Sequence, residues 1–114
     1  MSELRRGNVV WAELDPVLGR EQSGRRPALV VASDLYLEQA STLAIVLPAT
    51  TINRGWPNHI LLRGPQLALP EPTFVMTEQP RTVTRDRFVG DIGVVDAATM
   101  RKVDVWLRDF FSLH

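Results

Sequence analysis

The sequence contains no cysteine, only two histidines, His59 and His114, and a single lysine, Lys102. Without thiols the chain forms neither a disulfide framework nor a thiolate metal site, and it has no cysteine nucleophile. Two histidines are too few for an imidazole-rich metal centre. We therefore expect no resident metal or cofactor, and a reducing compartment as the setting.

An excess of charge of one sign is also missing, as are long hydrophobic runs. Thirteen basic and thirteen acidic residues give a net charge of zero, so a broad basic surface is excluded and any contact with a polyanion has to be local. Residues 1–6 lack the apolar core of a signal peptide, and no later run reaches membrane-spanning length. We expect a cytoplasmic protein with no membrane partner.

The 114 residues, 45% of them apolar and 23% charged, are typical of one globular domain over 1–114. Strands are expected at about 7–14, 27–32, 42–49, 58–63, 74–76, 81–84 and 90–95, with one helical turn near 35–38 and a helix over 97–111. We interpret 42–49 and 58–63 as a hairpin-like pair across a polar turn. Many short strands and one terminal helix predict a mainly β (α+β) fold: a small, strongly curved β-barrel with a C-terminal α-helix.

The terminal helix shows the clearest periodicity. Asp96 is placed to cap it, and four apolar residues recur at three- and four-residue intervals: Met100, Val103, Leu107 and Phe110. Trp106 and Phe111 are expected to complete the core, and an exposed remainder would mark a partner site. Asp104 precedes Arg108 by one turn, which predicts an ion pair on the wet face.

The common catalytic motifs are missing: no phosphate-binding loop, no nucleophile elbow and no His-Glu-x-x-His helix. Arginine, carboxylate, hydroxyl and amide groups remain. This set suits a substrate that carries its own nucleophile, because the protein then has only to orient it, neutralise charge and move protons. RNA is such a substrate, since attack by its 2′-hydroxyl on the adjacent phosphate leaves a 2′,3′-cyclic phosphate and a 5′-hydroxyl. A non-enzymatic RNA-binding barrel is the open alternative.

Several segments carry a family resemblance. They are "GNVVW" at 7–11, "DP" at 15–16, "GREQSGRRPALVV" at 19–31, "IVLPATT" at 45–51, "EQPRT" at 78–82 and "VDVWLRDFF" at 103–111. In this order and spacing they resemble the MazF/PemK/Kid family of toxin endoribonucleases, over nearly the whole chain. Arg20 and Arg25 depart from the pattern that many relatives show, which leaves the base preference open.

The resemblance implies an SH3-like barrel that forms a homodimer and cuts single-stranded RNA at a short preferred sequence without a metal. It also implies a cognate antitoxin whose extended tail covers the RNA groove. Carried over by position, Arg26 and Thr50 are the central catalytic pair at the ends of adjacent strands. Arg26 would stabilise charge on the phosphorane, and Thr50 would hydrogen-bond a phosphate oxygen. Glu21 would either accept the 2′-hydroxyl proton or orient Arg26.

The RNA-binding residues expected by the same comparison are Gln22, Asn53, Trp56, Glu78, Gln79 and Arg81. Trp56 either stacks a splayed base or anchors its loop to the core. Glu78 and Gln79 either read base edges or hold a turn. His59 has no partner identifiable from the sequence and is expected to be structural. The same barrel also serves toxins that poison DNA gyrase without nuclease activity, which is a second alternative.

Overall fold

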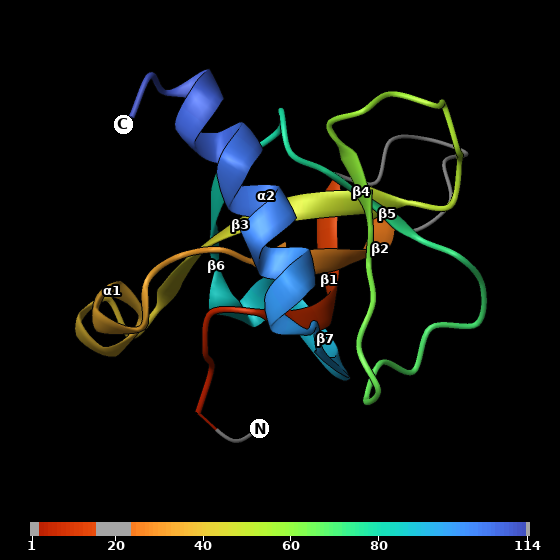
Figure 1. The fold of residues 1–114 in the computed structure, drawn as a ribbon. Helices are drawn as coiled ribbons and strands as arrows, with labels where there is room; N and C mark the ends of the chain where they lie inside the picture. The colour runs from red at the N-terminus through yellow and green to blue at the C-terminus, as the bar shows by residue number, and fades with distance from the viewer. Residues whose placement is uncertain (1–2, 16–23, 114) are drawn as a thin grey trace.

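The computed structural model describes residues 3–15 and 24–113 (Figure 1). Its elements in chain order are β1 (Asn8–Asp15), β2 (Gly24–Val30), α1 (Asp34–Gln39), β3 (Leu43–Thr50), β4 (His59–Leu61), β5 (Phe74–Met76), β6 (Arg81–Thr84), the 3-10 turn η1 (Arg85–Arg87), β7 (Phe88–Val94) and α2 (Ala97–Phe110). Within this part of the chain, no helix is both long and apolar enough to cross a membrane.

The described strands form a seven-stranded antiparallel sheet. Six of them follow the order β4-β5-β3-β2-β1-β7, and the seventh, β6, pairs with β3 along the same edge as β5. The amino-terminal half of β3 pairs with β6 and its carboxyl-terminal end pairs with β5. The predicted mainly β fold with a C-terminal helix is confirmed, and strands β4 and β7 leave the sheet open between them.

The strands at 74–76 and 81–84 lie where the sequence predicts them, but the hairpin-like pairing of β3 with β4 is wrong. Strand β5 lies between them: Phe74 pairs with Thr50, and His59 pairs with Met76. The connection over residues 51–58 exceeds the about two to five residues of a typical hairpin loop. Strand β5, which comes later in the chain, therefore pairs with the end of β3 in place of β4.

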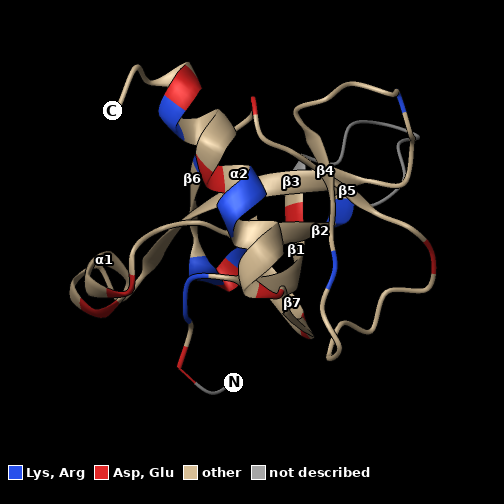
Figure 2. Ribbon diagram, viewed as in Figure 1, with Lys and Arg blue, Asp and Glu red and all other residues tan. Residues whose placement is uncertain are grey.

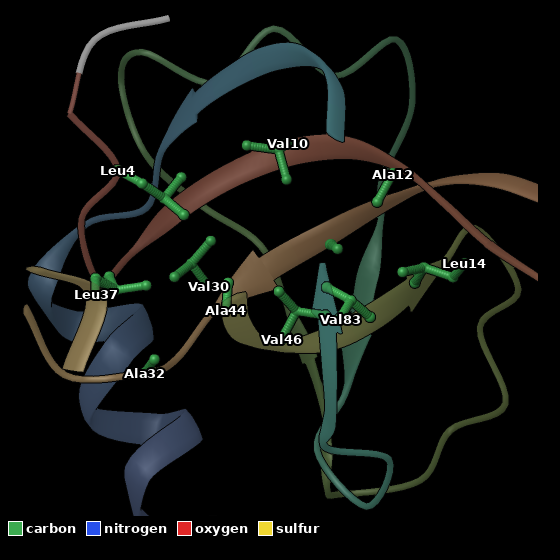
Figure 3. Close-up of a cluster of buried hydrophobic side chains, with 11 residues drawn as sticks. Leu4, Val10, Ala12, Leu14, Val30, Ala32, Leu37, Ala44, Val46 and Val83 are labelled. Atoms are coloured by element: carbon green, nitrogen blue, oxygen red, sulfur yellow. The ribbon is translucent and has the colours of Figure 1, made fainter. Parts of the chain in front are cut away.

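The sheet has an apolar core on each face, because successive residues of a strand point to opposite sides. On β2, Ala28 and Val30 belong to one cluster and Leu29 to the other. The inner core collects side chains from β1, β2, β3 and β6, which point toward one another in Figure 3. On the opposite face, the helix core packs beneath α2, whose Val103 is completely buried. The curved sheet thus wraps around the inner core while α2 covers its other side (Figure 1).

Helix α2 begins as predicted, since the Thr99 N–H donates to Asp96 Oδ1 at 2.8 Å. Trp106 packs against the helix core, which confirms that expectation. Phe111 is 57% exposed, so its assignment to the core is wrong. It is the C-cap residue, just beyond the last turn of the helix.

The predicted pairing of Asp104 with Arg108 is also replaced. Arg6 donates from both terminal nitrogens to the two carboxylate oxygens of Asp104, and Arg6 Nε donates to the Val31 carbonyl at 2.9 Å. The side chains of Arg6 and Asp104 are 31% and 24% exposed. A residue near the amino terminus thereby fastens α2 to the end of β2, a contact across 98 positions that helical spacing does not reveal.

The segment after β4 closes over the edge of β7 by backbone contact. The Ala68 N–H donates to the Ile92 carbonyl at 3.0 Å, and the Asp96 N–H donates to the Arg63 carbonyl at 2.8 Å. Gly93 has φ +137, and a Cβ there would lie 2.1 Å from the Gln66 carbonyl oxygen. Position 93 therefore requires glycine.

Candidate functional site

Arg26 and Thr50 lie at the same end of two neighbouring strands. Residue Ala28 of β2 pairs with Pro48 of β3, and continuing this antiparallel register by two residues sets Arg26 opposite Thr50. Residues directly opposite each other share a face of the sheet, here the face of the inner core. We call these two residues the strand-end pair. Arg26 is exposed, while Pro27 immediately behind it is buried and anchors the strand.

The hydroxyl of Thr50 has a defined local role. It accepts a hydrogen bond from the Ile52 N–H at 3.1 Å, so that the chain turns as β3 ends. A hydroxyl that accepts one hydrogen bond still has its own hydrogen to donate. The residue is only 8% exposed, so the hydroxyl is held in place at the edge of the core, ready to donate to an anionic oxygen.

A second group of side chains surrounds Trp56 on the connection from β3 to β4 and on the turn after β5. We call it the Trp56 cluster: Arg54, Trp56, Asn58, His59, Glu78 and Gln79. Trp56 is 51% exposed, its ring centroid lies 4.8 Å from that of His59, and Arg54 Cζ lies 5.7 Å from the Trp56 centroid. The indole is therefore supported by one ring while much of its surface stays open, as a stacking platform requires.

Glu78 is the polar centre of this cluster. Its Oε1 accepts from Asn58 Nδ2 at 2.9 Å and contacts His59 Nε2 at 3.2 Å, and its Oε2 accepts from Gln79 Nε2 at 3.3 Å. Burial acts to raise the pKa of Glu78, but hydrogen bonds from its own backbone, His59 and Gln79, together with the charge of protonated His59, outweigh burial and lower the pKa. The carboxylate is therefore ionised at neutral pH.

His59 is buried, with 2% of its side chain exposed. Its Nδ1 has no hydrogen-bond partner within the described part of the chain, whereas its Nε2 faces Glu78. The sequence did not reveal this partner, because Glu78 lies 19 positions away. The sheet register would have found it: His59 pairs with Met76, and a residue two positions further on returns to the same face.

The strand-end pair and the Trp56 cluster share one face of the sheet. Thr50 pairs with Phe74 and His59 pairs with Met76. Since Phe74 and Met76 are two positions apart on β5, the side chains of Thr50 and His59 point the same way. Strands β3 and β4 flank β5, which puts them roughly 10 Å apart. One extended ligand can therefore reach both.

The other predicted residues have structural contacts. Asn53 accepts from the Gly55 N–H at 3.0 Å and shapes the loop. Arg81 Nη2 donates to the Leu14 carbonyl at 3.0 Å, which ties β6 to the end of β1. The structure thus brings Trp56, Glu78 and Gln79 together, and Asn53 and Arg81 each make a contact within the fold. The predicted Glu21 and Gln22 lie outside the described residues.

Charge is distributed rather than concentrated. Figure 2 shows basic and acidic positions interspersed along the ribbon, and Arg25 lies 3.8 Å from Glu13 on the exposed surface. Among residues 3–15 and 24–113, no group of three or more histidine or acidic side chains is arranged to hold a metal ion. Anion binding at this site therefore has to come from a few positioned groups, as the net charge implied.

The fold and the site define a small, mainly β protein with an arginine and a threonine at the same end of two neighbouring strands and a half-exposed tryptophan on the same face of the sheet. Residues 5–111 match the family described as PemK-like, MazF-like toxin of type II toxin-antitoxin system. The chain belongs to this family.

Curated relatives and solved structures match nearly the whole chain. The chain is 30% identical to Endoribonuclease EndoA of Bacillus subtilis (strain 168), with 96% of each chain covered. It is 32% identical to Endoribonuclease MazF9 of Mycobacterium tuberculosis (strain H37Rv), with 92% and 93% covered. The crystal structure of MazF from Deinococcus radiodurans is 25% identical and superposes with a TM-score of 0.79 over 98% of this chain and 99% of that one. A MazE-MazF structure from the same organism, 24% identical and fully covered, has a TM-score of 0.81 and shows the same fold.

Proposed function

We propose that this chain is an endoribonuclease toxin that cleaves single-stranded RNA at a short preferred sequence without a metal and is neutralised by a cognate antitoxin. Its membership of the PemK/MazF family and the endoribonuclease names of its relatives support the activity. The single structural observation that carries the proposal is the pairing of Ala28 with Pro48, because this register, continued by two residues, sets Arg26 opposite Thr50.

The proposed chemistry is an internal displacement at phosphorus. The 2′-oxygen attacks the adjacent phosphorus while the bond to the 5′-oxygen breaks, leaving a 2′,3′-cyclic phosphate and a 5′-hydroxyl. The 2′-hydroxyl loses its proton to a base and the departing 5′-oxygen gains one. Arg26 stabilises the charge that accumulates on the phosphorane oxygens, since the guanidinium group of arginine keeps its positive charge in proteins. Thr50 donates its hydroxyl hydrogen to a phosphate oxygen.

Glu21 is proposed either as the base that accepts the 2′-hydroxyl proton or as a group that orients Arg26, and Gln22 as an RNA contact beside it. Trp56 would stack a splayed base, an interaction worth about 1–3 kcal/mol. Arg54, next to the indole, adds a cation at the same loop. Glu78 and Gln79 would read the edge of that base or hold the turn beside it, and Asn53 and Arg81 would contact the RNA next to them.

Two protein partners belong to the proposal. The first is an antitoxin: structures that share this fold include MazE-MazF from Deinococcus radiodurans and a mycobacterial endoribonuclease with its cognate antitoxin. The second is another copy of this chain. Exposed Phe111 and Leu113 line a groove of about 460 Å³ between α2 and the sheet, an apolar surface that a homodimer would cover. Sedimentation at micromolar concentration should give a dimer, and a monomer would contradict this assignment.

We place the activity in the cytoplasm, where the RNA substrate is found.

One assay tests the activity. The purified chain is incubated with mixed-sequence RNA in excess EDTA, and the cut site is mapped. A matched RNA with a single 2′-deoxy substitution at that site should stay intact. Cleavage that survives the deoxy substitution would refute internal attack. Absence of any RNA cleavage, together with inhibition of gyrase, would refute the nuclease proposal and indicate the other toxin class.

A further inference from the structure

The carboxylate of Glu78 determines in which direction the side-chain amides of Asn58 and Gln79 point their oxygen atoms. An ionised carboxylate only accepts hydrogen bonds, so the amides of Asn58 and Gln79 both turn their NH₂ groups toward it, at 2.9 and 3.3 Å. Each side-chain oxygen is then directed away from Glu78. Neither oxygen has a hydrogen-bond partner within the described part of the chain, so the cluster presents two amide oxygens as acceptors.

His59 holds the carboxylate in this position. Its Nε2 lies 3.2 Å from Glu78 Oε1, and its ring packs against Trp56 at 4.8 Å. Nδ1 is enclosed and without a partner among the described residues. Because an ionised carboxylate only accepts hydrogen bonds, Nε2 carries the N–H that donates to Glu78. His59 thereby links the stacking surface to the carboxylate that orients the amides.

A nucleobase on Trp56 would meet these acceptors at its edge. Adenine, cytosine and guanine each carry an exocyclic amino group that donates hydrogen bonds, whereas uracil has carbonyl oxygens at the corresponding positions. Uracil has one ring donor, N3–H, between its two carbonyl oxygens, so an amide oxygen placed to meet an exocyclic amino group would face a carbonyl oxygen instead and be left unpaired. The arrangement therefore discriminates by the hydrogen-bonding character of the base as well as by stacking.

We propose that the Trp56 cluster is a specificity subsite that selects an amino-bearing base over uracil, with Asn58 and Gln79 as the readers and His59 and Glu78 as positioning residues. The inference rests on the proposed ribonuclease activity. It assigns Glu78 to holding the readers rather than to reading the base itself, and it gives the buried histidine a role in sequence preference.

The first test changes only the RNA. Digestion of a random pool by the wild-type chain, with end mapping, should show one position near the cut from which uracil is depleted. The preferred base there is then replaced by its analogue without the amino group: purine for adenine, hypoxanthine for guanine, or 2-pyrimidinone for cytosine. The loss of kcat/KM should be about three- to tenfold, the equivalent of one net hydrogen bond. An unchanged rate, or no position that disfavours uracil, would overturn the inference.

The second test changes the protein. Glu78→Gln introduces an amide that both donates and accepts, so Asn58 and Gln79 are no longer forced to present oxygens. The ratio of kcat/KM for the amino-bearing substrate over the uracil-containing substrate should fall by the same three- to tenfold factor. Glu71→Gln is the matched control, because it neutralises another exposed carboxylate outside the cluster. A Glu78→Gln profile identical to that of wild type would refute the orienting role.

His59 is tested by separating ring packing from hydrogen bonding. His59→Phe keeps a ring beside Trp56 but donates nothing to Glu78, so the base preference should weaken although the melting temperature is maintained. His59→Gln restores an N–H donor and should restore the preference. Equal profiles for the two variants would contradict the positioning role. If the wild-type chain cleaved no RNA, the proposed function would fail; wild-type cleavage with none of these changes in preference would refute this inference alone.

Discussion

If Arg26 and Thr50 act on the same phosphate, their removal should be strongly non-additive. The test is a double-mutant cycle with Arg26→Ala, Thr50→Val and the combined variant. Valine matches threonine in shape and removes only the hydroxyl, whose contact within the described residues is the Ile52 N–H. Losing that local bond should lower the free energy of unfolding by about 0.5–1.5 kcal/mol. All three variants should therefore remain folded at assay temperature.

The expected magnitudes follow from the charge on the phosphate. Removing Arg26 should reduce kcat by about a hundredfold, roughly 2.7 kcal/mol, as for one donor that stabilises a developing oxyanion. Removing the Thr50 hydroxyl should cost about 1.5–3 kcal/mol, the range for a hydrogen bond to a charged group, or roughly ten- to a hundredfold. Independent effects would multiply to a loss of about a thousandfold or more.

The assay is single-turnover cleavage of the mapped RNA, which isolates the chemical step from product release. Because groups that act as a unit show a shared loss, the double variant should lie within about tenfold of Arg26→Ala alone. Thermal melting of each variant controls for unfolding. A double-variant loss equal to the product of the two single losses would mean that the residues do not meet at one phosphate, and the register argument for the strand-end pair would fail.

Three further predictions concern the framework. Gly93→Ala should destabilise the chain by at least about 2 kcal/mol, because position 93 has a positive φ and a Cβ there would clash with backbone. The control Gly90→Ala should cost far less, because its Cβ would only contact a side chain at 3.4 Å. Equal denaturant midpoints for the two variants would refute the clash. Val103→Ala should cost about 2–3 kcal/mol in urea unfolding, since this fully buried residue would leave a cavity under α2; a loss below about 0.5 kcal/mol would mean that the helix core repacks around it. Hydrogen bonds from Thr99 lower the pKa of Asp96 below 3.8. The contribution of Asp96 to stability should therefore be complete above that value and disappear as the pH falls through the lowered pKa. Melting temperatures measured across acid pH should depend less on pH in Asp96→Asn than in the wild-type chain.

Local patterns predicted most of the fold because each strand or helix carries its own signal. The short strand Phe74–Met76 is bounded by prolines and turn residues, and Asp96 marks the start of α2 by its capping chemistry. Pairing between distant strands has no such signal. The insertion of β5 between β3 and β4 and the bond from Arg6 to Asp104 depend on where separate segments meet, which alternation and helical spacing do not specify.

The candidate site likewise has a part that local sequence signals predict and a part that depends on the pairing of distant strands. The sequence predicts that Arg26 and Thr50 share one end of the sheet, because both sit at strand termini that adjacent antiparallel strands bring together, and the antiparallel pairing of β2 with β3 agrees with this. It could not predict the partner of His59, since Glu78 reaches it only through the register of β4 with β5. A buried histidine and an exposed carboxylate far apart in the chain each look unremarkable until the sheet pairs them.

This arrangement also explains how a chain of zero net charge can handle a polyanion. In the proposed complex, the ionised Glu78 carboxylate would repel phosphate from its own side of the Trp56 cluster, whereas Arg26, roughly 10 Å away across two strand spacings, would attract it. The uncharged face of a base has no such penalty and gains stacking on Trp56. Under the proposed function, one carboxylate would therefore contribute to orientation in two ways: it would turn the oxygens of the neighbouring amides toward a base, and it would favour the phosphate on the side where Arg26 and Thr50 lie. A broadly basic surface would bind RNA more tightly but would hold it in many registers, and cleavage at a preferred sequence requires one.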